Sequence, residues 1–437
     1  MSATTITGLA ARRVWDSRGH PTVEVEVTLA GGATGRAAAP AGASRGRAEA
    51  VERRDGGTRL GGRDVQGALA AIRDEIAPAL NGMDAADQRG VDGALIALDG
   101  TARKARLGGN AIVATSLAVA VAAARASDLP LFLHVAALAG TAPALPLPEI
   151  QIFGGGAHAA GRVSVQDFLV MVPGAASLDE AFEVTAEIYH AAGALMARRG
   201  RLAGVADEGG WWPDFRATEE ALDTLAEAIE AAGEHPGERV VMALDIAASE
   251  FHEDGRYTLD GATLTPAAMA ARVGTWLDGW PIASIEDPMA ETDAEGMRAL
   301  TAAEGGRVQI VGDDYLVTDA ARVRAAAAGG ACNAVLVKPN QAGSLTEAID
   351  AVAAAREAGF GAILSARSGE TEDVWLTHLA TGLGAGQIKV GSFARSERMA
   401  KWNEALRVAG DARAGGFVAG RPLAGTWWGR RHARESE

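Results

Sequence analysis

Charged side chains follow short apolar runs at regular intervals in the second half of the chain. In chain order they are Asp245, Glu286, Asp313, Lys338, Arg367 and Lys389. Successive positions are 41, 27, 25, 29 and 22 residues apart, spacings that suit one strand and one helix each. Three carboxylates from successive strands are therefore expected to face three basic groups.

Carboxylates brought together repel one another unless a cation neutralises them, and Mg²⁺ with oxygen ligands is the simplest such cation. Lys338 and Lys389, two of only four lysines in the chain, would lie beside it. A neighbouring divalent cation lowers the pKa of an ammonium group, so a lysine, unlike an arginine, can act as a base. The pattern predicts metal-assisted proton abstraction. In the simpler alternative, each acid only caps a helix or faces solvent.

The elements that must position these residues are alternating strands and helices. Apolar runs near residues 241, 282, 308, 335, 363 and 388 are separated by stretches with helical periodicity. Repeated units of this size predict a parallel sheet, and at this length a (β/α) barrel. In such a barrel all the carboxyl ends of the strands meet on one face.

The N-terminal part has a different pattern. Val23, Val25, Val27 and Leu29 alternate with other residues before a turn, which is typical of a hairpin, and helical periodicity follows from about 63 to 138. We expect an N-terminal α+β capping domain over 1–140, a proline-containing linker over 141–148, the barrel over 149–429 and a tail over 430–437.

Composition restricts the function classes. The 437 residues carry a net charge of −15 without a basic stripe, which argues against a nucleic-acid partner. The longest apolar run, 111–124, is short and broken by Thr115 and Ser116, so we expect a buried helix and no membrane partner. The first residues lack a targeting pattern, and the single cysteine, Cys332, fits a reducing compartment. These features predict a cytoplasmic protein.

The chain resembles the enolase family over essentially its whole length. The matching strings are DSRGHPTVE at 16–24, GAS at 42–44, LDGT at 98–101, GGAH at 155–158, DEGG at 207–210, DIAASEF at 245–251, SIEDP at 284–288, GDD at 312–314, KPNQ at 338–341, RSGETED at 367–373 and RSER at 395–398. Their order is more specific than any one of them. The resemblance implies an α+β domain followed by an enolase-type (β/α)8-like barrel, and a homodimer or a higher even homo-oligomer.

The resemblance also implies roles for the metal-binding and proton-transferring residues. The first Mg²⁺ would be held by Asp245, Glu286 and Asp313, and Ser44, on a mobile loop, would ligate a second Mg²⁺ when substrate binds. A lysine base working with Mg²⁺ is the known pattern of this superfamily. Lys389 matches that base, and Lys338 matches the lysine that stabilises the dianionic intermediate.

Further matches concern the leaving group and the substrate. Glu208 matches the acid that protonates the departing hydroxyl, and Asp167 stands where the family has its paired glutamate. The residues that match groups holding the carboxylate, hydroxyl or phosphate of a small anionic substrate are His158, Gln166, Arg367 and Ser368.

Departures from the family pattern fall on the phosphate and leaving-group side. Ala366 replaces a histidine, Asp167 is one methylene shorter than glutamate, and Arg45 stands on the closing loop where the family has threonine. We expect Arg45 to contact an altered or larger anionic substrate. The departures favour a diverged paralogue acting on a 2-phosphoglycerate- or phosphoenolpyruvate-type acid, such as a carboxyphosphonoenolpyruvate synthase of phosphonate biosynthesis. The alternatives are an ordinary enolase (phosphopyruvate hydratase) and a non-catalytic binding or scaffold descendant.

Overall fold

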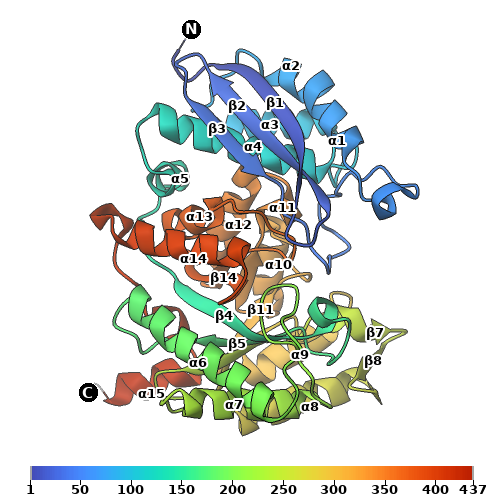
Figure 1. Ribbon diagram of the computed structural model, residues 1–437, viewed down its shortest axis with the longest axis vertical. Coiled ribbons are helices and arrows are strands. Elements are labelled where there is room, and N and C mark those ends of the chain that lie inside the picture. The colour runs from blue at the N-terminus through green and yellow to red at the C-terminus, as the bar shows by residue number, and fades with distance from the viewer. Residues whose placement is uncertain (1, 436–437) are drawn as a thin grey trace.

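The computed structural model describes residues 2–435, which form a small N-terminal domain lying beside a larger barrel domain (Figure 1). In the N-terminal domain, three antiparallel strands pair in the order β1-β2-β3. They are β1 (Ile6–Trp15), β2 (Pro21–Leu29) and β3 (Thr34–Ala38). The alternating residues Val23, Val25 and Val27 are fully buried, as their pattern predicts for the core face of a sheet.

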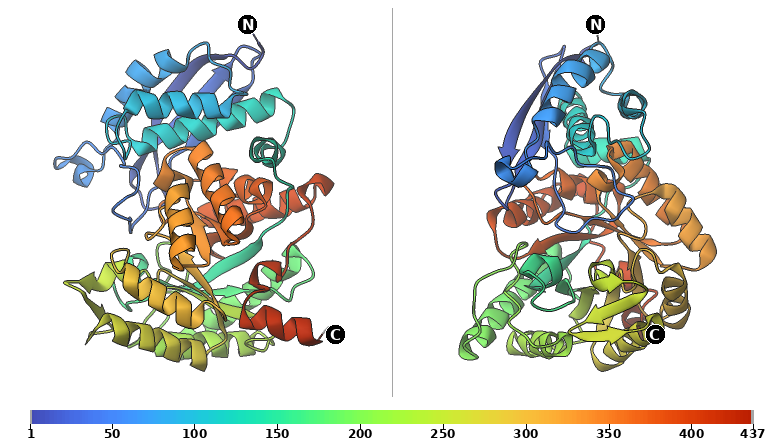
Figure 2. Two further views of the ribbon diagram at one scale, coloured as in Figure 1. Left: turned by 180° about the vertical axis from the view of Figure 1, so that it is seen from behind. Right: turned by 90° about the vertical axis from the view of Figure 1, so that its right-hand side faces the viewer.

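Helices cover one face of this sheet (Figure 2). They are α1 (Gln66–Ala71), α2 (Ala77–Leu80), α3 (Gln88–Asp99) and α4 (Gly109–Ala126), with a π-helical turn at Ile72–Ile76 between α1 and α2. Helix α5 (Leu131–Ala139) follows α4 and packs on it. The backbone of α4 lies so close to β3 that a Cβ on Gly35 would meet Ala118 O and Ala122 N at 2.2 Å. Glycine at this position therefore allows the helix to pack directly on the sheet.

Helix α4 is the one helix within residues 2–435 that is long and apolar enough to cross a membrane. However, 83% of its apolar stretch is buried inside the protein. A helix that is apolar on all sides belongs either in a core or in a membrane. Its burial against the sheet and the neighbouring helices is that of a core helix.

The second domain is a closed barrel with the strand order β10-β11-β12-β13-β14-β4-β5-β6. Its strands are β4 (Leu147–Gly154), β5 (Asp167–Met171), β6 (Val241–Asp245), β10 (Ile282–Glu286), β11 (Gln309–Gly312), β12 (Ala334–Val337), β13 (Gly361–Ser365) and β14 (Gly386–Ser392). The six predicted apolar runs correspond to β6 and β10–β14, which confirms the predicted fold class. Strand β4 begins at Leu147, so it includes the end of the predicted linker.

The prediction of a wholly parallel sheet is wrong for one strand, because β5 runs antiparallel to both β4 and β6. No α-helix separates β4 from β5; the connection holds only a 3-10 turn at Gly156–Ala159, so the chain reverses. Two helices, α6 (Leu178–Arg198) and α7 (Thr218–Ala231), separate β5 from β6 and pack on each other. A pair of helices brings the chain back to the end of the barrel that it left, so β6 is antiparallel to β5.

The remaining helices surround the barrel. They are α8 (Pro266–Gly279), α9 (Ala294–Glu304), α10 (Ala320–Gly329), α11 (Pro339–Ala342), α12 (Leu345–Ala358), α13 (Trp375–Leu383), α14 (Ser396–Ala409) and α15 (Trp427–Glu435). A separate small sheet consists of β7 (His252–Glu253), β8 (Arg256–Leu259) and β9 (Ala262–Leu264). Short 3-10 turns lie at Arg59–Gly62, Ala248–Phe251, Ala412–Ala414 and Arg421–Leu423.

The two tryptophans at the start of α15 pack against the barrel. The indole of Trp427 donates to Ile282 O at 2.8 Å and that of Trp428 to Glu238 O at 2.6 Å. Trp428 is buried among residues of β4, β5 and β6, including Leu147, Leu169 and Val241. An indole buries a large apolar area while its N–H finds an acceptor, so α15 packs as part of the barrel.

Candidate active site

The strand ends bring the predicted charged residues together. Asp245 and Glu286 end adjacent strands in register, Asp313 follows β11, Lys338 follows β12, and Lys389 lies in β14. Arg367 follows β13 by two residues. All six side chains are buried, at 3–8% exposure. The predicted convergence on one face of the barrel is therefore present.

Lys389 lies at the centre of this group. Its Nζ is 2.7 Å from Asp245 Oδ2, 2.7 Å from Glu286 Oε2 and 3.6 Å from Asp167 Oδ2. Burial alone would lower the pKa of its ammonium group, but the surrounding carboxylates, Asp245 and Glu286 first, raise that pKa well above its usual value. The ammonium thus takes the position of a counter-ion between two carboxylates.

Lys338 is the counter-ion of the third carboxylate. Its Nζ lies 2.5 Å from Asp313 Oδ2, and the other oxygen of Asp313 accepts from Gln341 Nε2 at 2.8 Å. Burial opposes the charged form of Lys338, but Asp313 raises its pKa. Among the protein's own side chains both lysine pKa values are therefore raised. From the sequence we predict lowered pKa values for both lysines, because a bound divalent cation is expected beside them.

The oxygen atoms at this face fit a hard divalent cation. Glu286 Oε1 and Gln166 Oε1 are buried and have no hydrogen-bond partner among residues 2–435, although Gln166 Nε2 donates to Asp245 at 3.1 Å. Burial and the neighbouring Asp245 raise the pKa of Glu286 well above its usual value. An unpaired buried carboxylate oxygen is costly, and Mg²⁺ is bound by oxygen atoms of this kind. Asp245, Glu286 and Asp313 thus offer a donor set suited to Mg²⁺.

Three carboxylates form a tight cluster on one side of this face. Oxygen atoms of Asp287, Asp313 and Asp314 lie within 4.8 Å of one another. Burial, followed by repulsion from Asp313, raises the pKa of Asp287 well above its usual value and that of Asp314 to about 9. Asp287 also accepts from the backbone N–H groups of Asp313 and Asp314, at 2.9 and 2.7 Å. Asp287 therefore fixes the turn that carries Asp313.

An imidazole lies between two carboxylates on the other side. His158 Nδ1 is 2.8 Å from Asp167 Oδ1, and Nε2 is 3.7 Å from Glu208 Oε1. Burial disfavours the imidazolium, but Asp167 and Glu208 raise the pKa of His158 to about 9. Asp167 has a pKa lowered to about 2 against the effect of burial, chiefly by His158. His158 therefore bridges Asp167 and Glu208, the two acids that are paired in the family resemblance.

The loop over 41–50 lies on this face and is fixed by Arg367. The guanidinium binds Glu49 at 3.0 and 3.1 Å and donates to Ser44 O at 2.9 Å. Ser368 Oγ accepts from Ala43 N at 2.7 Å. A Cβ on Gly42 would lie 2.0 Å from Arg367 Nη2, so only glycine permits this approach. The loop brings Ser44 to the same small cavity as the acids and lysines.

The structure gathers the predicted site residues around that cavity with one exception. Ser44, His158, Gln166, Asp167, Glu208, Asp245, Lys338, Arg367, Ser368 and Lys389 line it, and so does Ala366. Glu286 and Asp313 reach it through their contacts with the lysines. Arg45 instead faces a different cavity, with its guanidinium 3.8 Å from Glu52. Its expected contact with an anionic substrate stays a prediction.

Sequence reasoning missed three polar residues that position the site. Glu49 holds Arg367, Gln341 holds Asp313, and Gln151 donates to the carboxylate of Asp167. Gln341 lies three residues after Lys338, in the short helix α11 that follows β12, and this closeness in sequence could have identified it. Glu49 is 318 residues from Arg367 in the chain, and no local pattern connects them.

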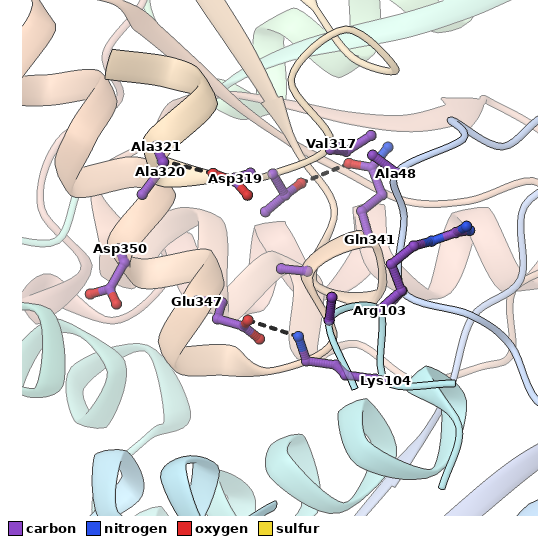
Figure 3. Close-up of a pocket in the computed structure, with 14 residues that line it drawn as sticks. Ala48, Arg103, Lys104, Val317, Asp319, Ala320, Ala321, Gln341, Glu347 and Asp350 are labelled. Carbon is purple, nitrogen blue, oxygen red and sulfur yellow. Dashed lines mark hydrogen bonds and ion pairs between the residues drawn. The ribbon is translucent and has the colours of Figure 1, made fainter. Parts of the chain in front are cut away.

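A second cavity is lined by Lys104, another of the four lysines (Figure 3). Lys104 is 6% exposed, and its Nζ donates to Glu347 Oε1 at 2.8 Å. Gln341, which binds Asp313 on one side, lines this cavity and accepts from Thr318 Oγ1 at 2.7 Å (Figure 3). Lys104 joins the N-terminal domain to α12, so its role here is to hold the two domains together.

Comparison with known proteins assigns both domains. A family model described as the N-terminal domain of enolase matches residues 6–135, and one described as the C-terminal TIM barrel domain of enolase matches residues 142–424. The chain is 49% identical over 403 residues to a protein named enolase from Acidothermus cellulolyticus. That alignment covers 92% of this chain and 94% of the relative.

Proposed function

The chain belongs to the enolase family of enzymes, and on this premise we propose that it removes the proton next to the carboxylate of a 2-phosphoglycerate-type acid. The observation that carries the proposal is the position of Lys389, whose Nζ lies 2.7 Å from both Asp245 and Glu286. An amine buried among metal-type ligands is placed to serve as a base beside a charged substrate.

Asp245, Glu286 and Asp313 would hold one Mg²⁺, and Ser44 a second when substrate is present. Bound Mg²⁺ supplies a Lewis acid that stabilises the negative charge of an ene-diolate. With Asp245 and Glu286 engaged as ligands, Lys389 would lose the partners that retain its proton and could accept the α-proton. Lys338, which lines the same cavity, remains charged and stabilises the developing dianion.

The acid side of the site is assigned to Glu208. This carboxylate is 6% exposed and lies next to the His158–Asp167 pair, so a proton can reach a departing hydroxyl in this cavity. In this proposal Asp167 orients His158, and His158, Gln166, Arg367 and Ser368 bind the anionic groups of the substrate. A small anionic substrate, a cytoplasmic location and an even homo-oligomer belong to the same proposal.

Two features favour a diverged paralogue, such as a carboxyphosphonoenolpyruvate synthase, over an ordinary enolase. Ala366 lines the cavity and has no donor for a phosphate group. Asp167 is occupied by His158 and Gln151 and makes no hydrogen bond to Glu208. The second candidate, phosphopyruvate hydratase, is favoured by the 49% identity to an enolase and by the complete set of acids and lysines.

The test follows two rates in one sample. The protein is incubated with Mg²⁺ and 2-phosphoglycerate in heavy water, and nuclear magnetic resonance records both exchange of the α-proton and formation of phosphoenolpyruvate. A paralogue is expected to exchange the proton at least ten times faster than it forms phosphoenolpyruvate, whereas comparable rates indicate an ordinary enolase. Both rates should vanish with a chelator. Absence of exchange at saturating Mg²⁺ and 2-phosphoglycerate would refute the proposed proton abstraction.

A further inference from the structure

A separate cavity of the N-terminal domain opens beside the catalytic cavity. It lies between the turn after β1, the loop over 42–45 and the segment over 52–63. The two cavities share Gly42 and Ala43, and Asp207 of the outer cavity is the chain neighbour of Glu208 in the inner one. A molecule entering the catalytic cavity from this side would pass the outer one.

Arginine side chains dominate the lining of this outer cavity. Arg18, Arg45, Arg54 and Arg63 face it together with His20, against the carboxylates of Glu52 and Asp207. The whole chain has a net charge of −15, so an excess of cations in one concave region is a local exception. Guanidinium groups match the planar geometry of phosphate and carboxylate oxygens, and several in one cavity form a typical anion site.

Several of these guanidinium groups have N–H donors without an acceptor in the described part of the protein. Arg63 has no carboxylate within 4.0 Å in the described part of the chain, and its Nη1 contacts only the ring nitrogens of His20, at 2.8 and 2.9 Å. Arg45 approaches Glu52 no closer than 3.8 Å. Arg18 Nε is buried without a hydrogen-bond partner among residues 2–435. A buried donor such as Arg18 Nε is costly unless a ligand supplies the acceptor. Arg45 and Arg63 are exposed, so their donors are open to a ligand from solvent.

The electrostatic environment of His20 also reflects this excess of positive charge. Burial and the positive charge of Arg63 lower the pKa of His20, which keeps that imidazole neutral and able to accept from Arg63. Arg54, in contrast, is fixed by Glu52 at 2.9 Å and by Pro21 O at 2.5 Å. Arg54 therefore serves as a support. Arg18 Nη2 donates to Ala41 O at 2.9 Å, so Arg45, Arg63 and the unpartnered Nε of Arg18 remain as the groups that can bind an anion.

We propose that the cavity formed by Arg18, Arg45 and Arg63 is a binding site for a phosphate-type dianion, distinct from the catalytic cavity. It takes either a free anion or a phosphoryl group carried by a molecule that extends out of the catalytic cavity. The role of Arg45 is then recognition at this outer site. The proposal does not depend on which reaction the catalytic cavity performs.

The test is calorimetric titration of the full chain with inorganic pyrophosphate in the presence of a chelator, at constant ionic strength. Arg63→Gln is expected to weaken binding at least tenfold, and Arg45→Gln/Arg63→Gln further, because each change removes charged donors from the anion. The matched control is Arg324→Gln, which removes an exposed guanidinium paired with Glu357 on the outer helices and should change binding less than twofold. Circular dichroism and thermal melting verify that each variant is folded.

The titration is repeated with the protein saturated by phosphoenolpyruvate and Mg²⁺, after that binding is itself confirmed. This second titration distinguishes a free anion from a phosphoryl group carried by a ligand of the catalytic cavity. Retained pyrophosphate binding identifies a free-anion site, and its loss identifies a site for a group carried by the catalytic ligand. The proposal is overturned if the wild type binds no pyrophosphate, or if Arg63→Gln weakens binding no more than Arg324→Gln does.

Discussion

At the residue scale, buried cations compensate part of the carboxylate charge around the cavity. Lys389 compensates Asp245 and Glu286, Lys338 compensates Asp313, and His158 compensates Asp167. These charges are buried, so removing one member leaves its partner without compensation in a poorly solvated place. A substitution that changes a charge in this cavity must therefore be shown to leave the protein folded before its effect on chemistry is interpreted.

Ala366 offers a neutral position for such a substitution. Its side chain is 6% exposed and lines the cavity, next to Arg367 and Ser368. Ala366→His introduces an N–H donor where the phosphate side is expected. We predict at least a tenfold rise in kcat/KM for the dehydration of 2-phosphoglycerate, measured by the absorbance of phosphoenolpyruvate. Ala366→Leu fills similar space without a donor and should give no rise; equal gains from both variants would contradict the assignment.

At the scale of elements, the loop over 41–50 and the turn after β13 are held together across the domain boundary. The buried pair of Arg367 and Glu49 fixes the loop, and Ala41 pairs with Gly369 as an isolated bridge. Ala38, at the end of β3, donates its N–H to Asp373 at 2.6 Å. The position of the loop therefore depends on a few polar contacts.

Glu49→Gln tests the first of these contacts. Because the change leaves a buried guanidinium uncompensated, we expect the free energy of unfolding to fall by about 3 kcal/mol in urea titrations. Hydrogen exchange of residues 42–50 should accelerate as well. Glu357→Gln, which breaks an exposed pair with Arg324, should cost less than about 1 kcal/mol. Unchanged exchange in the loop of Glu49→Gln would show that the pair does not hold it.

Asp373 gives a pH-dependent test of the same boundary. Burial raises its pKa to about 6, against the opposing effects of the Ala38 N–H and Lys401. A carboxyl group with a raised pKa in the folded state favours folding when protonated, so its contribution is lost as pH rises from about 4 to 6. Asp373→Asn should therefore gain about 1–2 kcal/mol of unfolding free energy relative to wild type between pH 4 and pH 7. A difference that does not change with pH would contradict this pKa.

Much of this arrangement could be predicted from the sequence, but not its loops. The positions of Asp245 and Glu286 follow from strand ends, which a repeating pattern reveals, and Lys389 follows the last of the apolar runs. The contact of Glu49 with Arg367 joins residues 318 positions apart, and the direction of Arg45 depends on Glu52 and the surrounding cavity. The reversal at β5 was missed because it depends on the number of helices in a connection, and apolar periodicity does not report strand direction.

At the scale of the whole molecule, the four lysines share one property, which is burial. Lys104, Lys338, Lys389 and Lys401 are 6%, 8%, 5% and 0% exposed. Lys104 pairs with Glu347, and Lys401 pairs with Glu370 at 3.1 Å. Arginine therefore supplies the basic surface, and every lysine lies at a place where a compact ammonium is enclosed by acceptors.

The burial of the lysines predicts how the native protein reacts with an amine-directed ester. Peptide mass spectrometry should find all four lysines at least tenfold less reactive in the native protein than after unfolding in guanidinium chloride. Free lysine added to both samples provides the internal standard. Rapid labelling of Lys104 or Lys401 in the folded protein would contradict the enclosed positions described above.

The measurement that tests the central claim most directly is α-proton exchange of 2-phosphoglycerate in heavy water by Lys389→Gln, with Mg²⁺ present. Lys389→Gln should reduce exchange by a factor of about 10² to 10⁴, because the base is gone while the other groups of the cavity remain. Glu208→Gln serves as the matched variant, and it should slow dehydration while leaving exchange within about threefold of wild type. Exchange by folded Lys389→Gln at the wild-type rate would contradict the account.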